Sequence, residues 1–93
     1  MSRLHCLSHT DALADCLQSA SPGDALLLLG DGCYLALPSH AQHAQLRDAG
    51  IKLHVLQEDA QARGVDPASG IVPVDYPGFV ELTITCKTQH AWF

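Results

Sequence analysis

The chain has 93 residues, of which 47% are hydrophobic and 16% are charged, and its net charge is -5 with the histidines neutral. These values predict one small globular domain over residues 1–93 and exclude a disordered chain, and the low charge indicates that part of the surface is covered by another chain. The five Lys and Arg residues are scattered singly, which argues against direct binding to nucleic acid through a basic patch.

The first residues lack the long apolar segment of a signal peptide, and the longest strongly apolar run, residues 25–29, is too short to cross a membrane. We therefore expect a cytoplasmic protein that does not bind membranes. Cysteines stay reduced in that compartment. The chain has four, with neither a CxxC pair nor the spacing of a metal knuckle among them: Cys6, Cys16, Cys33 and Cys86.

The first third of the chain predicts a strand, a helix and a second strand. Residues 4–7 form a short apolar strand, after which Ser8 or Thr10 is expected to cap a helix. Residues 21–24 form a turn, and residues 26–29 are the continuous apolar run of a strand covered on both faces in a parallel sheet. The helix shows the i, i+3, i+4 and i+7 spacing of one apolar face in Leu13, Cys16, Leu17 and Ala20.

The middle of the chain predicts a helix, a third strand and a further short helix. Residues 33–37 are expected to be extended, and a capping box at residues 39–42 opens a helix that ends near Asp48. Residues 51–56 alternate as a strand, and residues 58–63 form a short helix that a glycine closes.

The last third of the chain contains the one ambiguous segment. Residues 71–74 predict a fourth strand at an edge of the sheet, because Pro73 cannot donate a hydrogen bond. Residues 79–86 fit either a strand or a helix, and Asp75 as an N-cap with a proline in the first turn favours the helix. Residues 90–93 predict a short final strand.

Alternating strands and helices predict the α/β class, as a small doubly wound three-layer domain with a four- to five-stranded, mainly parallel sheet. Sites in such sheets lie beyond the carboxyl ends of the strands. There Gly30-Asp31-Gly32 precedes Cys33, which is either a reactive thiol or, as we favour, a packed residue after an ordinary turn. The segment is neither GxGxxG nor a Walker loop, so nucleotide binding has no support.

No cofactor and no metal site is predicted. His40 and His43 share a predicted helix face, and Cys86 and His90 are four residues apart, but no further ligands follow at a matching spacing. The aromatic residue near the end of the chain, Trp92, is expected either at an interface with a partner or in the core.

Several motifs, read together, resemble one family. They are Leu4-His5, Gly23-Asp24 leading through an apolar run to Asp31-Gly32, Ile51-Lys52-Leu53, Glu58-Asp59, Ala62-Arg63-Gly64, Val74-Asp75-Tyr76, Phe79-Val80 with Leu82-Thr83, and Ala91-Trp92. Their order and spacing are more specific than any single piece. The chain resembles the TusB/DsrH family of sulfur-relay subunits essentially from end to end, which implies the DsrEFH-like form of the α/β fold.

The resemblance implies a subunit of a cytoplasmic TusBCD-like complex, a heterohexamer with TusC/DsrF-like and TusD/DsrE-like subunits. Such a complex relays persulfide sulfur to a TusE/DsrC-like acceptor, toward 2-thiolation of the tRNA wobble uridine. The principal sulfur-accepting cysteine belongs to the TusD/DsrE-like subunit, so this chain is expected in a structural or accessory role without independent catalytic activity. The alternatives are a DsrH-like subunit of a DsrEFH complex in dissimilatory sulfur oxidation, and a small α/β interaction module with only structural thiols.

The resemblance also draws attention to two cysteines. Cys16 resembles the helix cysteine of DsrH-type members, and Cys86 is similar to a cysteine near the end of DsrH, although TusB proteins can have other residues at both places. Cys16 is therefore the candidate accessory sulfur carrier. The spacing of the first helix instead predicts that Cys16 is buried, whereas a thiol that carries sulfur must be partly exposed and form a thiolate.

Overall fold

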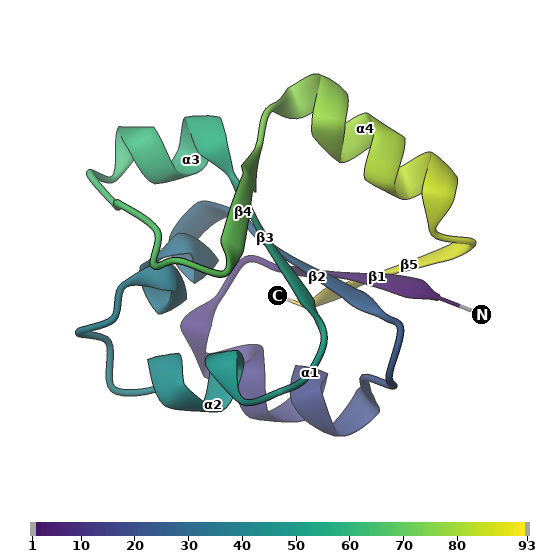
Figure 1. Ribbon diagram of the computed structural model, residues 1–93, viewed down its shortest axis with the longest axis horizontal. Helices are drawn as coiled ribbons and strands as arrows, with labels where there is room; N and C mark the ends of the chain where they lie inside the picture. The colour runs from purple at the N-terminus through teal and green to yellow at the C-terminus, as the bar shows by residue number, and fades with distance from the viewer. Residues whose placement is uncertain (1, 93) are drawn as a thin grey trace.

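The computed structural model describes residues 2–92 and contains one five-stranded sheet in which all paired strands run parallel. The strand order is β4-β3-β2-β1-β5 (Figure 1). The predicted α/β class with a parallel sheet is confirmed. The strands are β1 (Arg3–Leu7), β2 (Ala25–Leu28), β3 (Lys52–Leu56), β4 (Ile71–Val74) and β5 (Thr88–Trp92).

Helical segments connect the successive strands. The connections from β1 to β4 move steadily toward one edge of the sheet, and the last one returns across it to place β5 beside β1. In Figure 1, α1 and α2 lie on one face of the sheet and α4 lies on the other. The α-helices are α1 (Leu13–Ser19), α2 (His43–Arg47), α3 (Gln57–Ala62) and α4 (Tyr76–Thr85), and the 3-10 helices η1 (Thr10–Ala12) and η2 (Gly30–Ala36) precede α1 and α2.

The sheet separates two apolar cores of unequal size. Strand β2 is buried along its whole length, and because side chains alternate along a strand it contributes Leu26 and Leu28 to one core and Ala25 and Leu27 to the other. The larger core lies under α1, α2 and η2. In the smaller core, α4 contributes partly buried side chains such as Phe79, so this face of the sheet is covered less completely.

The prediction of an extended segment at residues 33–37 is wrong. Residues Gly30–Ala36 form the 3-10 helix η2, and only Leu37, the residue that follows it, is extended. The cause is the close approach of η2 to β1: a Cβ atom on Gly32 would lie 2.2 Å from the carbonyl oxygen of Leu7. Only a glycine allows this contact, and it fixes a tight turn after β2.

The predicted helix caps at residues 39–42 and at Ser8 or Thr10 are also wrong. Helix α2 begins at His43, and neither it nor η1 has a side-chain cap of the predicted kind. Ahead of α2, the backbone N–H of Gln42 donates a hydrogen bond to Nδ1 of His40 at 3.1 Å. The acceptor is therefore an imidazole and not the serine hydroxyl of the predicted capping box.

The predictions for the last third of the chain are confirmed. The Asp75 carboxylate accepts the N–H of Gly78 at 2.8 Å and caps α4, with Pro77 in the first turn, so this segment is a helix and not a strand. Strand β4 lies at an edge, as Pro73 indicated, and the final strand forms as β5. Residue 93 of the predicted final strand lies outside the described residues.

Candidate functional site

Cys16, the predicted accessory carrier, lies on α1 with its side chain fully buried in the larger core. Burial raises the pKa of its thiol to about 11, and the nearby charge of Asp24 adds to this effect. Sulfur transfer needs an accessible thiolate. In the folded chain the Cys16 thiol is therefore neither accessible nor ionised at neutral pH, and its carrier role stays a prediction.

Cys33, in η2, is fully buried as well. Its thiol donates a weak hydrogen bond to the carbonyl oxygen of Leu28, with sulfur and oxygen 3.8 Å apart. Burial raises the pKa of the Cys33 thiol to about 11 and the charge of Asp59 adds to it, although Arg63 acts in the opposite direction. This environment is that of a packed residue after a turn and not of a reactive thiol.

The glycines after β2 form a closed corner rather than a cradle for an anion. The backbone N–H of Gly30 donates to the Asp59 carboxylate at 2.7 Å, and the N–H of Gly32 donates to the carbonyl oxygen of Leu29 at 2.9 Å. A phosphate-binding loop presents such N–H groups to its ligand. Here they are already used within the chain.

The other two thiols lie on the opposite face of the sheet, under α4. Cys86 follows the end of α4 and is buried, and Cys6 on β1 is half-buried against the same smaller core. Burial raises the pKa of the Cys6 thiol, and the nearby Cys86 adds to this effect. None of the four cysteine side chains in the described part of the chain is exposed.

A buried hydrogen-bond network that the spacing of the sequence did not reveal joins His5, Asp24 and Trp92. Nε2 of His5 lies 3.0 Å from Oδ2 of Asp24, and Nδ1 of His5 lies 3.1 Å from Nε1 of Trp92. An indole N–H can only donate a hydrogen bond. Nδ1 therefore accepts from Trp92, and the neutral His5 ring has its proton on Nε2 and donates it to Asp24.

Asp24 is the centre of this network. Its carboxylate also accepts the backbone N–H groups of Arg3 and Ser21, each at 2.9 Å. Burial alone raises the pKa of the carboxyl, but the hydrogen bonds from His5, Ser21 and Arg3 and the charge of Arg3 outweigh it and hold the pKa at about 2. The network thus fixes β1, the turn before β2 and the end of β5 to one another. The signal in the sequence that could have indicated this network was a histidine and an aspartate placed beside the leucine-rich strands.

Trp92 is a packing residue within the chain. Besides its hydrogen bond to His5, its ring stacks on His90 with centroids 4.3 Å apart and packs against the larger core. Its role at an interface stays a prediction.

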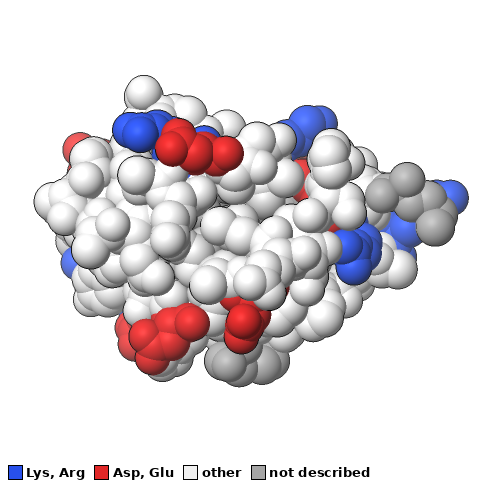
Figure 2. Space-filling model, turned by 90° about the horizontal axis from the view of Figure 1, so that it is seen from below, with Lys and Arg blue, Asp and Glu red and all other residues white. Residues whose placement is uncertain are grey.

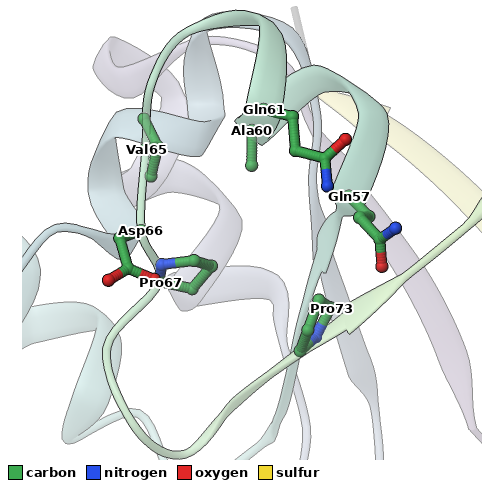
Figure 3. Close-up of a pocket in the computed structure, with 7 residues that line it drawn as sticks. All are labelled: Gln57, Ala60, Gln61, Val65, Asp66, Pro67 and Pro73. Atoms are coloured by element: carbon green, nitrogen blue, oxygen red, sulfur yellow. The ribbon is translucent and has the colours of Figure 1, made fainter.

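Two pockets at the surface of the described part of the chain have no cysteine in their lining. Gln57, Ala60 and Gln61 of α3 line a pocket of about 220 Å³ together with residues from the loop after the helix and Pro73 from β4 (Figure 3). A second pocket, of about 170 Å³, lies between α2, β3 and the start of β4. The first is lined by Gln57, Ala60, Gln61, Val65, Asp66, Pro67 and Pro73, and the second by His43, Arg47, Ile51, Leu53, Ser69, Gly70 and Ile71.

The histidine pairs that the spacing suggested do not form a site. His40 lies before α2, whereas the Nδ1 of His43 donates to the carbonyl oxygen of Leu35 at 2.8 Å. His90 stacks on Trp92 beside the larger core, and Cys86 lies in the smaller one. Within residues 2–92, no three His, Cys, Asp or Glu side chains are grouped so that they could hold a metal ion.

His54, on β3, has a different environment from these histidines. Both of its ring nitrogens are buried and have no hydrogen-bond partner among the described residues. Burial lowers the pKa of the His54 ring, and the charge of Lys52 lowers it further.

The charged side chains form no continuous basic surface on the face that Figure 2 shows, which is the molecule seen from below Figure 1. The Lys and Arg side chains on this face lie apart, with uncharged residues between them. Nucleic acid binds to a basic patch or stripe. Within residues 2–92, no helix has the length and apolar character needed to span a membrane.

Comparison with known proteins decides the family. The model of the family described as "DsrH like protein" matches residues 6–89. The chain belongs to the DsrH-like family. It is 42% identical over 94 residues to Protein TusB of Shigella sonnei and 40% identical over 94 residues to Protein TusB of Escherichia coli O1:K1, and each alignment covers 96% of this chain and 99% of the relative. The identification as a TusB/DsrH-like chain is thereby confirmed.

The DsrH-like chain also shares its fold with a solved structure. The ychN protein from E. coli superposes with a TM-score of 0.73 over 99% of this chain and 100% of the other, at 12% sequence identity. At that identity the likeness concerns the fold alone, and it confirms the DsrEFH-like fold predicted from the motifs.

Proposed function

We propose that this chain is a single-domain subunit of a cytoplasmic TusBCD-like complex that relays persulfide sulfur toward 2-thiolation of the tRNA wobble uridine. Its role in that complex is structural or accessory. The observation that carries this role is the state of its thiols: none is exposed, and the pKa values of Cys6, Cys16 and Cys33 are raised.

The chemistry of a persulfide carrier explains why this observation matters. A carrier thiolate attacks the outer sulfur of a donor persulfide, the sulfur–sulfur bond of the donor breaks, and the donor leaves as a thiolate. A buried thiol with a pKa of about 11 is almost entirely protonated at neutral pH and cannot reach the donor. The sulfur-accepting thiol is therefore assigned to another subunit, the TusD/DsrE-like one.

The partners of the chain follow from this role. They are TusC/DsrF-like and TusD/DsrE-like subunits in a heterohexamer, and a TusE/DsrC-like acceptor that reaches the chain through the complex. The net charge of -5 and the five scattered cationic residues support a role without direct contact to tRNA.

Sulfur labelling of the reconstituted complex tests the proposal. We incubate the complex with a persulfide donor and the acceptor and locate the added sulfur by mass spectrometry, using the native chain, Cys16→Ala and the control Cys33→Ala. Label is expected on the TusD/DsrE-like subunit and not on Cys16, and both variants should keep transfer within about twofold of the native rate. Persulfide on Cys16 together with at least tenfold loss of transfer in Cys16→Ala alone would show that Cys16 carries sulfur.

The second candidate is a DsrH-like subunit of a DsrEFH complex in dissimilatory sulfur oxidation. It is favoured by the cysteines at positions 16 and 86, which resemble those of DsrH-type members. Expression of this chain in a bacterium that lacks its own TusB separates the candidates. Recovery of 2-thiouridine in tRNA supports the relay to tRNA. A failure despite assembly with the host subunits favours sulfur oxidation.

A further inference from the structure

Helix α4 is apolar on two opposite sides. Its inward side packs Phe79 and Leu82 against the smaller core. Its outward side presents Tyr76, Val80 and Ile84, whose exposed fractions are 52%, 54% and 77%. These residues are four apart and form one ridge along the helix, which we call the α4 ridge. A helix that is hydrophobic on both sides normally packs on both sides, so the α4 ridge is an interaction surface.

The two ends of the α4 ridge carry opposite charges. At the Tyr76 end, the exposed Asp75 caps the helix and Oε2 of Glu58 accepts the backbone N–H of Tyr76 at 3.4 Å. At the Ile84 end, the exposed Lys87 follows the helix. The α4 ridge therefore has an acidic end at Asp75 and a basic end at Lys87.

We propose that the α4 ridge packs against the same ridge of a second copy of this chain, with the two helices antiparallel across a two-fold axis at Val80. The spacing is symmetric about this residue, so Tyr76 of one copy meets Ile84 of the other and Val80 meets Val80. Antiparallel order brings the basic end of each helix to the acidic end of the other, so that the exposed Lys87 of one copy faces the exposed Asp75 of the other. A parallel pair would instead place like charges together.

This inference rests on the proposed function, in which the heterohexamer contains two copies of the chain. The α4 ridge has only three large side chains, whereas a stable interface usually buries about 800 Å² on each partner. The ridge is therefore expected to join two halves of a larger complex together with contacts from neighbouring subunits. For that reason the test uses the assembled complex.

Disulfide cross-linking in the complex tests the axis directly. Val80→Cys is expressed with the TusC/DsrF-like and TusD/DsrE-like subunits and oxidised with copper phenanthroline. Most of the chain should run as a disulfide-linked dimer of itself on a non-reducing gel, and reductant should reverse this. The control is Gln18→Cys, which places a thiol at an exposed position of α1 on the opposite face of the sheet and should give at least tenfold less dimer.

A second variant, Ile84→Asp, puts a charge into the α4 ridge at its most exposed position. Light scattering should show the mass of the complex falling by half, with an unchanged circular dichroism spectrum. The inference is overturned if the assembled Val80→Cys complex forms no disulfide-linked dimer of this chain, or if the disulfide links the chain to a different subunit. It is also overturned if the Ile84→Asp complex keeps its full mass. Each of these results leaves the proposed function standing. Failure of the native chain to assemble with those subunits overturns the proposed function instead.

Discussion

Replacing Asp24 with asparagine tests the buried network that joins β1, β2 and β5. The native carboxylate accepts hydrogen bonds from three fixed donors, namely the backbone N–H groups of Arg3 and Ser21 and the Nε2–H of His5. An asparagine side chain has one acceptor oxygen, and its NH₂ group would face those donors. At least one buried donor therefore loses its partner, while the shape of the side chain is kept.

The pKa of Asp24 gives the size of the effect. It is about 2 instead of the ordinary 3.8, a difference that corresponds to about 2 kcal/mol in the free energy of unfolding. Because the pKa is lowered in the folded state, the unfolded chain binds more protons in acid. This stability is complete above about pH 5 and is lost as the pH falls toward about 2. Asp24→Asn should therefore lower the free energy of unfolding by about 2 kcal/mol at neutral pH and remove this part of the acid dependence.

Urea unfolding of the full chain, followed by the fluorescence of its only tryptophan, Trp92, measures both effects. The experiment compares neutral pH with two values between about pH 5 and about pH 3, where the native chain should lose stability. The control is Asp48→Asn, whose native side chain is 71% exposed and which should change the free energy by less than about 0.5 kcal/mol. If Asp24→Asn is as stable as the native chain at neutral pH, or keeps its acid dependence, the reasoning about this network is wrong.

Two further predictions concern the thiols and the corner after β2. At pH 8, a pKa of about 11 leaves Cys16 and Cys33 with about 100-fold less thiolate than a thiol at the ordinary 9.0, so mass spectrometry should find them alkylated by iodoacetamide far more slowly in the folded chain than in urea. Equal rates in both conditions would contradict their burial. Gly32→Ala should cost roughly 2–4 kcal/mol because its Cβ would meet the Leu7 carbonyl oxygen, whereas Gly50→Ala, in open space at a φ of 74°, should cost about 1 kcal/mol. Urea unfolding compares the two variants, and equal losses would rule out the close contact as the cause.

The sequence predicted the elements whose signals are local. Alternation and apolar runs located the strands. Asp75 as an N-cap with a proline in the first turn favoured a helix over a strand for residues 79–86, and the structure has the helix α4 there. The segment of η2 was predicted wrongly because its shape depends on the contact between Gly32 and Leu7, which no spacing within the segment reveals. A turn fixed by tertiary contact cannot be predicted from its own residues alone.

The candidate site was predictable to a similar extent. The helical spacing of Cys16 correctly predicted its burial, and the family motifs correctly predicted the family. The network of His5, Asp24 and Trp92 was missed because its members are 19 and 87 residues apart in the chain, and their contacts depend on the strand order. The raised pKa values of the Cys16 and Cys33 thiols follow from this same burial.

The pairing of β5 with β1 has a consequence for how the chain is made. Strand β1 lies inside the sheet, between β2 and β5, and its register with β5 runs from Arg3 opposite Thr88 to Leu7 opposite Trp92. During translation β1 can gain one neighbour early, but the other is synthesised only after residue 87. Until then one edge of β1 keeps unpaired backbone groups that can bind another strand. The last step of folding must therefore follow release of these residues from the ribosome, and chaperones have this interval in which to protect the open edge.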